Sequence, residues 1–492
     1  MTEVFLPLAI LFTSLCIAPV ILMLPERAVA LRTAINLGAA ALKLFLVVWL
    51  TIGVVNGATF QVGLTMLPGL DFVLYVDALS VLFLALSALL WLLTTIYAIG
   101  YLEVGQNCSR FFGFFSLCVA ATVGIAMSGN LFTFLIFFEV LTLATYPLVV
   151  HRGTADALRA GRIYLAYTLG GGLALTVGVV WLHTLAGPFL FTPQGVLGEL
   201  PVTHAGTLQI IFVLLIMGVG VKAALIPLHA WLPISMVAPA PVSALLHAVA
   251  VVKAGAFGIM RIVYDVYGVD ATQALGLATP LAAAAAATII YGSVRALTQD
   301  DLKSRLAFST VSQVSYIALG VALISPIAAT GGLVHLIHQG IMKITLFLCA
   351  GNFTEGHGVK KISQMNGMGK LMPLSMLFFT IAAFGMIGLP PLAGFVSKWY
   401  LGAGGLDAGQ AWVIAILLGS SLLNAAYFLP IVYRGWFLPP QAATATPVRR
   451  IGWMLLLPPA ATALLIVLAG VFANAPFSPL GWTQFIVSLE YQ

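Results

Sequence analysis

The feature that most constrains this chain is a near-continuous succession of apolar runs. We find about fourteen of them, most about 18–25 residues long, which is the length an α-helix needs to cross a bilayer. Only 7% of the 492 residues are charged, whereas soluble domains carry about 25%. So little charge cannot cover a water-soluble surface. The sequence therefore predicts an all-α integral membrane protein.

The predicted spans are numbered in chain order. Their approximate limits are 4–24, 33–55, 77–99, 111–129, 131–150, 163–185, 207–235, 242–263, 274–292, 306–324, 327–350, 372–400, 411–436 and 452–473. Spans 7 and 12 are overlong because each contains a proline break, at Pro227 and Pro233 in the first and at Pro390 and Pro391 in the second. The weakest apolar stretch, 57–76, is interpreted as a re-entrant or amphipathic segment.

Positive charge is distributed unevenly among the predicted loops. Lysine and arginine occur in loops that follow odd-numbered spans and are absent after spans 2, 4, 6, 10 and 12, with Arg261 as the one exception. The positive-inside rule then predicts odd-numbered loops in the cytoplasm and both termini outside, in the cell inner (plasma) membrane. This topology explains the excess of basic residues without a nucleic-acid partner.

Charged residues inside the spans are the second informative feature. Of 15 acidic residues, Glu139 alone is predicted to lie well inside an apolar run, FLIFFEVLTLATYP. A lysine at the bilayer centre costs about 2.5–3.5 kcal/mol even on insertion scales, so intramembrane charges of this kind indicate ion movement. Lys43 has a simpler alternative, which is snorkelling or a contact with a partner helix. The lysines inside predicted spans are Lys43, Lys222, Lys253, Lys343 and Lys398.

Lys222 lies beside the break at Pro227, in the segment VKAALIPLHAWLP. Pro227 has no amide to donate, so the carbonyl of Ala223, one turn earlier, has to face protein or water. We expect Glu139 to pair with Lys222, because each charge offsets part of the desolvation of the other. Separation of the pair would let Lys222 pass its proton on. The alternative is a static structural ion pair.

Histidines extend this set, because histidine titrates nearest to neutral pH. His335 and His338 share one face of span 11, and Lys343 follows further along the same span. His229 and His247 are candidate relays, with a packed histidine as the alternative for each. No cysteine pair has the spacing of a metal site, so no metal is expected. The residues predicted to translocate protons or cations are Glu139, Lys222, Lys253, His335, His338, Lys343 and Lys398.

A proline break close to a lysine occurs twice, in span 7 and in GMIGLPPLAGFVSKWYL of span 12. The five-span separation predicts two five-helix repeats, 111–263 for helices 4–8 and 264–436 for helices 9–13. An odd number of helices per repeat makes the second inverted relative to the first, which is a transporter architecture. Helices 1–3 occupy 1–110, and helix 14 with a tail occupies 437–492.

Six motifs carry a resemblance to a known family. They are FFEVLTLATYP (137–147), GVKAALIPLHAWLP (220–233), VVKAGAFGIMR (251–261), DDLKSRLAFSTVSQVSY (300–316), HLIHQGIMKITLFLCAG (335–351) and GLPPLAGFVSK (388–398). Together they resemble the antiporter-like membrane subunits shared by Mrp-type cation/proton antiporters, respiratory complex I and membrane-bound hydrogenases.

The resemblance implies a fold of fourteen helices with both termini outside. It also implies roles for the intramembrane residues. Glu139 and Lys222 form the pair in the half that opens inward, and Lys253 is the relay. His335, His338 and Lys343 continue the path, and Lys398 stands at the exit.

The subtype favoured by length and by Lys398 is the D-type subunit of a monovalent cation (Na+)/H+ antiporter. The alternative is a proton-pumping subunit of a complex I-like NADH-quinone oxidoreductase or hydrogenase, which LHAWLPISMVAPAPVSALLHA resembles more closely. A stand-alone secondary permease is a third interpretation. The first two imply other membrane subunits as partners and no cofactor in this chain, which carries no redox chemistry of its own.

Overall fold

The computed structural model describes residues 2–102, 105, 107–198, 200–442 and 447–491, and most of them are helical. Twelve helices within these ranges are long and apolar enough to cross a membrane, which confirms a multi-pass helical membrane protein. Helix α15 (Leu302–Ala322) and the consecutive pair α18 (Pro373–Ile387) and α19 (Ala393–Asp407) lie beside them. The count of fourteen spans and the two inverted repeats stay predictions.

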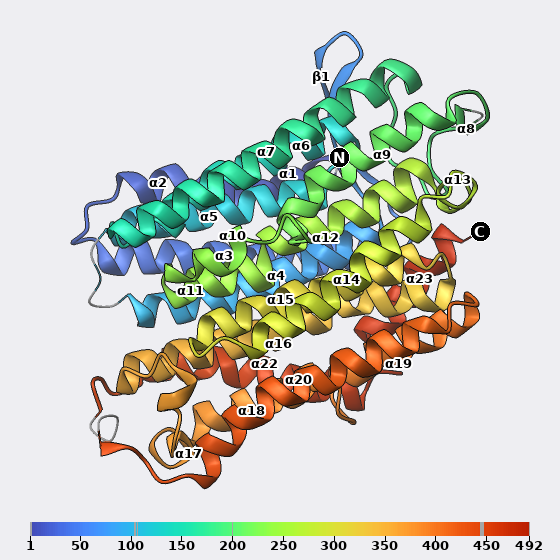
Figure 1. Cartoon of the computed structure of the whole chain (residues 1–492). Coiled ribbons are helices and arrows are strands. Elements are labelled where there is room, and N and C mark those ends of the chain that lie inside the picture. The colour runs from blue at the N-terminus through green and yellow to red at the C-terminus, as the bar shows by residue number, and fades with distance from the viewer. Residues whose placement is uncertain (1, 103–104, 106, 199, 443–446, 492) are drawn as a thin grey trace.

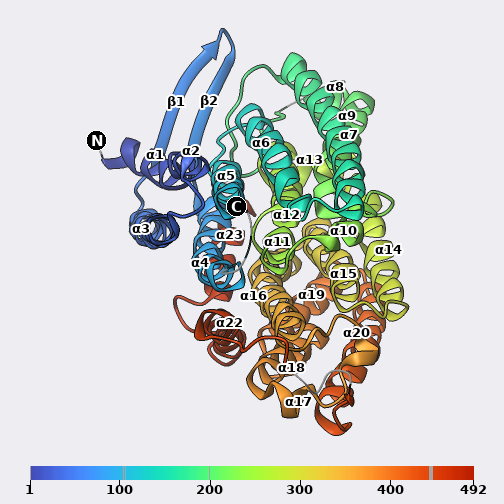
Figure 2. The same ribbon diagram turned by 90° about the vertical axis from the view of Figure 1, so that its left-hand side faces the viewer.

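The N-terminal region contains helices and one β-hairpin. Its elements are α1 (Thr2–Leu15), α2 (Ile17–Met23), α3 (Val29–Val55), β1 (Phe60–Leu67), β2 (Leu70–Val76) and α4 (Ala78–Tyr101). The expectation of a re-entrant or amphipathic segment at 57–76 is wrong, because these residues form an antiparallel hairpin. Pro68 and Gly69 supply its turn, with Gly69 at φ +80°, a conformation that glycine adopts at little cost. The hairpin extends past the edge of the helix bundle (Figure 2).

The next elements include the first predicted break. They are α5 (Cys108–Ala126), α6 (Leu131–Val149), α7 (Ala155–Ala186), α8 (Leu200–Thr203), α9 (Ala205–Ala223), α10 (Trp231–Ile234), η1 (Ser235–Val237), α11 (Ala240–Ala244), η2 (Leu245–Val249), α12 (Val251–Arg261) and η3 (Ile262–Tyr267). Helix α9 ends where Ala224 turns left-handed, at φ 58°. The break predicted in span 7 is therefore present. Segments α11 to η3 together form one buried span.

The C-terminal half contains the second break and one unexpected helix. Besides α15, α18 and α19, its elements are α13 (Val269–Ala274), α14 (Ala278–Leu297), α16 (Pro326–His357), η4 (Ile362–Gln364), α17 (Met368–Leu371), α20 (Trp412–Phe437), α22 (Trp453–Val471) and α23 (Pro479–Glu490). Gly388, at φ 94°, ends α18 before Pro390 and Pro391. Part of the expected tail forms helix α23. Ser478 caps the start of this helix, since its Oγ accepts a hydrogen bond from the Gly481 amide at 3.0 Å.

The long helices run roughly side by side, with α16 near the middle of the bundle (Figure 1). Loops after odd-numbered spans meet at one end, which we call the basic end. There the Leu302 amide donates to the Lys360 carbonyl at 2.9 Å, and Lys303 Nζ donates to the Ala238 carbonyl at 2.6 Å. The opposite end carries the hairpin, α8 and α13, and we call it the hairpin end. The basic loops thus gather at one end, as the charge count predicts.

Candidate functional site

The first break places Lys222 in the last turn of α9, fully buried. Its Nζ donates to the Phe138 carbonyl of α6 and lies 3.4 Å from the centroid of the Phe138 ring. Across the break, the Trp231 indole donates to the Val221 carbonyl at 2.7 Å. The ammonium is therefore held by a carbonyl and an aromatic face, both uncharged, in a site closed to solvent.

Glu139, the predicted partner of Lys222, follows Phe138 on α6 and is half-buried. The two residues make no direct ion pair, although their charges are close enough to interact. Oε1 of Glu139 is buried without a hydrogen-bond partner. The carboxylate packs against Gly172 of α7, where an added Cβ would lie 2.8 Å from Glu139 Cδ. The structure therefore brings Glu139 and Lys222 close to each other without a direct ion pair between them.

Lys253 connects the two halves. It is fully buried on α12, and its Nζ donates to the Leu336 carbonyl of α16 at 2.6 Å. Helix α12 also packs tightly on α9, because a Cβ at Gly255 would lie 2.6 Å from the carbonyl carbon of Lys222. Lys253 thus links α12, which packs beside Lys222, to Leu336, the residue after His335 on α16.

The second break is connected to α16 through His335. Nδ1 of His335 lies 2.8 Å from Ser397 Oγ, and its ring packs 5.2 Å from that of Tyr316. Ser397 immediately precedes Lys398 on α19. Two buried residues, His335 and Ser397, therefore join α16 to the broken span, and the half-buried Lys398 follows Ser397 on α19.

Lys398 folds back onto the end of α18. Its Nζ donates to the carbonyls of Met386 and Ile387 at 3.1 and 2.8 Å, and to Ser421 Oγ at 2.9 Å. These carbonyls belong to the last turn of α18, where the helix dipole favours a cation. Like Lys222, Lys398 is held at a helix break by uncharged oxygens.

Lys343 and His338 lie away from this contact chain. Lys343 Nζ donates to Ser309 Oγ at 2.6 Å and to the Leu306 carbonyl at 3.0 Å, both on α15. His338 is fully buried, and neither of its ring nitrogens has a hydrogen-bond partner. The contact of His335 is with Ser397, which precedes Lys398, whereas Lys343 contacts α15. The order implied by the resemblance, through His338 and Lys343, stays a prediction.

The two candidate relays are packed against aromatic rings. His247 is fully buried in η2, with its ring 4.4 Å from that of Phe347 and both nitrogens unpartnered. The ring of His229 lies 4.9 Å from that of Tyr291, and its Nδ1 has no partner. Neither contact distinguishes a relay from a packed histidine.

Lys43 does not snorkel. It is fully buried on α3, its Nζ lies 2.5 Å from Ser14 Oγ, and it stands 4.6 Å from the centroid of the Trp91 ring. The alternative of a partner-helix contact is confirmed. Of the five lysines within predicted spans, Lys43 alone lies outside both predicted repeats. Its described contacts, with Ser14 and Trp91, include none of the residues predicted to translocate protons.

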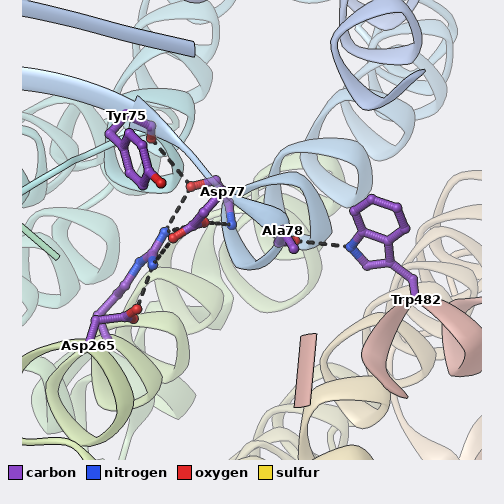
Figure 3. A network of polar contacts seen from close by, with 7 residues as sticks. Tyr75, Asp77, Ala78, Asp265 and Trp482 are labelled. Atoms are coloured by element: carbon purple, nitrogen blue, oxygen red, sulfur yellow. Dashed lines mark hydrogen bonds and ion pairs between the residues drawn. The ribbon is translucent and has the colours of Figure 1, made fainter. Parts of the chain in front are cut away.

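The sequence inventory of one buried acid is wrong. Asp265 is fully buried and pairs with Arg261 at 3.0 Å, while Asp77 pairs with the same guanidinium at 2.6 Å (Figure 3). These two carboxylates explain why Arg261 departs from the distribution of basic residues among the loops, because they compensate its charge. The spacing of Arg261 and Asp265, four residues apart on a helix, is the signal that could have found this pair. Among the described residues no group of three His, Cys, Asp or Glu side chains could hold a metal ion.

Comparison with known proteins shows which family this chain matches. Residues 128–424 match the family described as NADH:quinone oxidoreductase/Mrp antiporter, TM, and residues 68–112 match the N-terminus of chain 5 of NADH-ubiquinone oxidoreductase (complex I). NADH-quinone oxidoreductase subunit N of Desulforudis audaxviator is 37% identical over 382 residues, which cover 76% of this chain and 74% of that protein.

Antiporter proteins are related over part of their length. The probable K(+)/H(+) antiporter A/B protein of Rhizobium meliloti is 33% identical over 371 residues, 73% of this chain and 36% of that protein. The A1 protein of a Na(+)/H(+) antiporter from Staphylococcus haemolyticus is 29% identical over 431 residues, 82% of this chain and 53% of that protein.

Solved structures share the fold. A chain of the Mrp complex from a Dietzia species matches with a TM-score of 0.85 and 24% identity, covering 100% of this chain and 98% of that one. A chain of respiratory complex I from Thermus thermophilus matches with a TM-score of 0.82 and 24% identity, covering 99% of both. The family match covers residues 128–424, and subunit N of Desulforudis audaxviator is related over most of both chains. The chain therefore belongs to the family of antiporter-like membrane subunits shared by NADH:quinone oxidoreductases and Mrp antiporters.

Proposed function

We propose that this chain translocates protons as an antiporter-like subunit of a multisubunit complex in the cell inner membrane, with both termini outside. The observation that carries the proposal is the presence of two broken helices, each with a lysine held against its break. Lys222 stands at the end of α9 and Lys398 against the end of α18. Lys253 and His335 lie between them on contacting helices.

The inward half works through Lys222 and its partners. A buried lysine surrounded by uncharged groups releases its proton more readily than one in water, and a nearby carboxylate opposes that release. Glu139 is close to Lys222 but not bonded to it. A small shift of α6 or α9 would therefore change how strongly Glu139 holds the charge on Lys222. When the two separate, the proton can move towards Lys253.

The outward half uses His335 and Lys398. Nδ1 of His335 shares a hydrogen bond with Ser397 Oγ, and a hydroxyl can both donate and accept a proton. Lys398 then receives the proton on Nζ, which the carbonyls of Met386 and Ile387 hold as an ammonium. From Lys398 the proton leaves towards the predicted outside.

The parent complex is proposed to be a redox-driven, complex I-like pump. The relative that supports this is NADH-quinone oxidoreductase subunit N, which this chain matches over 74% of its length, against 36% for the A/B antiporter protein. The D-type subunit of a Na+/H+ antiporter is the second candidate, favoured by the likeness to a chain of an Mrp complex. Co-purifying subunits with iron–sulfur clusters would favour the first, and small membrane proteins alone the second.

The decisive experiment replaces the buried pair. We expect Lys222→Ala and Glu139→Ala each to abolish proton uptake by membrane vesicles that contain the complex, while the subunit still assembles. Lys222→Arg keeps the charge but fills the site with a bulkier, permanently charged group, so it is expected to assemble and remain inactive. Normal uptake in either alanine variant would remove the core of the proposal. Full transport by the chain purified alone would instead indicate a stand-alone permease.

A further inference from the structure

A second buried charge cluster lies at the hairpin end, outside the line from Glu139 to Lys398. Arg261 donates from Nη1 and Nη2 to both carboxylate oxygens of Asp77, at 2.6 and 2.9 Å, and from Nη1 to Asp265 Oδ2 at 3.0 Å. Ser80 Oγ accepts a further bond from Nη2 at 2.8 Å. Figure 3 shows Asp77 and Asp265 joined by this network of polar contacts.

Helix α23 covers this cluster with a third carboxyl group. Glu490, at the end of α23, is only 5% exposed, and its Oε2 is buried without a hydrogen-bond partner. Asp265 Oδ1 is also buried and unpartnered. The helix is tied down where Trp482 Nε1 donates to the Ala78 carbonyl at 3.0 Å (Figure 3).

The charges of the cluster do not balance. Two carboxyl groups contact the guanidinium and a third, that of Glu490, interacts with it electrostatically; Arg261 is the one cation among the groups that act on Glu490. Asp77 uses both oxygens on Arg261 and also accepts the Ser80 amide at 2.7 Å. Burial raises the pKa of Asp77, but Arg261 and Ser80 outweigh it and hold that pKa below its usual value. Asp77 is therefore the ionised partner of Arg261.

Two ionised carboxylates in addition to Asp77 would leave an uncompensated charge in a closed site, which is strongly unfavourable. A proton on one of them lowers the net charge of the cluster from −2 to −1 and lets the two carboxyl groups share a hydrogen bond, as in other carboxyl pairs. The unpartnered oxygens of Asp265 and Glu490 are the atoms available for it.

We propose that Glu490 and Asp265 form a proton-binding carboxyl pair at the hairpin end, which holds one proton at neutral pH and keeps α23 closed over the cluster. Burial first, and then the carboxylates of Asp265 and Asp77, raise the pKa of Glu490 to about 9. The shared proton belongs to the pair and not to either residue alone.

Other titratable groups near the pair do not replace this proton. Tyr264 and Tyr491 pack with ring centroids 6.2 Å apart, and phenols are neutral at pH 7. Helix α16 also packs against α23, but neither His335 nor His338 is among the groups that shift the pKa of Glu490. Loss of the proton therefore changes the net charge of the cluster from −1 to −2, and we expect α23 to loosen from Asp77 and Asp265.

Infrared spectroscopy of the assembled complex tests the proposal. Spectra are recorded in steps from about pH 6 to about pH 10, for the wild type and for Glu490→Gln, which keeps the shape of the side chain but cannot ionise. We expect the wild type to lose a protonated-carboxyl carbonyl band as the pH approaches about 9. Glu490→Gln should lack that band, and Glu490→Asp should restore a titrating one. An unchanged band in Glu490→Gln would overturn the proposal.

A matched control and a second measurement separate this result from a structural role. Glu355→Gln, on α16 at the basic end, removes a carboxyl group paired with Arg449 at 3.9 Å and should leave the band in place. Hydrogen–deuterium exchange of the wild type alone follows the closure of α23. Its amide protection, corrected for the intrinsic pH dependence, should fall from about pH 7 to about pH 10, while that of α22 stays constant. Constant protection of α23 would contradict the proposal, whatever the outcome of transport experiments on Lys222.

Discussion

At the scale of single residues, the four lysines of the proposed path share one type of partner. Lys222, Lys253, Lys343 and Lys398 all donate to backbone carbonyls, and the last two also donate to serine hydroxyls. None of the four makes a direct ion pair with an acid in the described chain. A carboxylate partner would hold the proton on the lysine, whereas a neutral oxygen tolerates the amine as well as the ammonium. These sites are therefore suited to proton transfer.

The contact between Glu139 and Gly172 can be tested with two alanines on one helix. A Cβ at Gly172 would overlap the Glu139 carboxylate, whereas a Cβ at Gly170 meets nothing within 4 Å. We expect Gly172→Ala to displace the carboxylate, destabilise the protein by about 1–3 kcal/mol through overpacking and slow proton uptake. Gly170→Ala should assemble and transport normally. Equal rates of proton uptake in the two variants would show that the position of Glu139 does not matter.

Ser397 is expected to carry the step from His335 to Lys398. Ser397→Ala removes the hydroxyl 2.8 Å from His335 Nδ1, and we expect proton uptake to fall about a hundredfold, at the lower end of the range for loss of a proton-transfer group. Ser421→Ala is the matched control, because Lys398 keeps two carbonyl acceptors without it. If uptake falls equally in both variants, the hydroxyl of Ser397 has no special part in the transfer.

Lys43 serves as a buried lysine outside the proposed path. Its ammonium contacts Ser14 and the ring of Trp91. Replacement of a buried charge by an apolar residue of similar length is often neutral or stabilising. We expect Lys43→Met to keep full proton uptake and an equal or higher melting temperature. Loss of uptake in an assembled Lys43→Met complex would extend the path to α3.

At the scale of secondary-structure elements, helix breaks and caps decide where charge can be held. The ends of α9 and α18 leave carbonyl groups available inside the bundle, and a side chain binds at each. The Trp231 indole donates to the Val221 carbonyl at the first break, and Lys398 donates to the Ile387 carbonyl at the second. An unbroken helix would have used these carbonyls internally. The breaks are thus the elements that create polar sites within apolar spans.

Helix α23 is expected to make stability depend on pH. The pKa of Glu490 is about 9 in the folded protein and about 4.3 in an unfolded chain. Between these values the folded state keeps a proton that the unfolded state has released, so the free energy of unfolding falls as the pH rises. Glu490→Gln should therefore raise the melting temperature relative to wild type, increasingly from about pH 5 to about pH 9. A constant difference in melting temperature across this range would contradict the assignment.

At the scale of the whole molecule, the two ends differ in charge and in structure. Basic loops at the basic end also bind the ends of helices, as where Arg449 Nη2 donates to the Gly100 carbonyl of α4 at 3.1 Å. The hairpin end carries β1 and β2 and the acidic cluster around Arg261. This asymmetry is what the positive-inside rule uses to orient a membrane protein.

The predicted orientation can be measured with single cysteines at the two ends. We expect Pro68→Cys, at the hairpin turn, to react with a membrane-impermeant maleimide in intact cells. Lys361→Cys, at the basic end, should react only after the cells are opened. The wild type, with its own four cysteines, provides the background. The reverse pattern would place the basic end outside and invert the direction of the proposed path.

Much of the fold could be predicted from the sequence, because lipid forces each span to satisfy its own backbone. The limits of α6 and α9 and both proline breaks follow from local sequence. The hairpin at 57–76 was missed because an exposed two-stranded ribbon has little apolar periodicity. Asp265 was missed because it lies at the end of an apolar span and its burial depends on Asp77 and α23, which are remote in sequence.

The sequence by itself determined the membrane class, the two breaks, the family and the identity of the intramembrane charges, since a charge or a proline within a long apolar run is conspicuous without any structure. Only the tertiary structure decided which of these residues contact each other. It bonds Lys253 of α12 to the Leu336 carbonyl of α16, bonds His335 to Ser397, and places Lys343 against α15. It also joins Arg261 to Asp77, 184 residues away, and Trp482 to Ala78, 404 residues away. Such contacts depend on how helices pack, and the apolar pattern of a span that is buried on every side does not specify its neighbours.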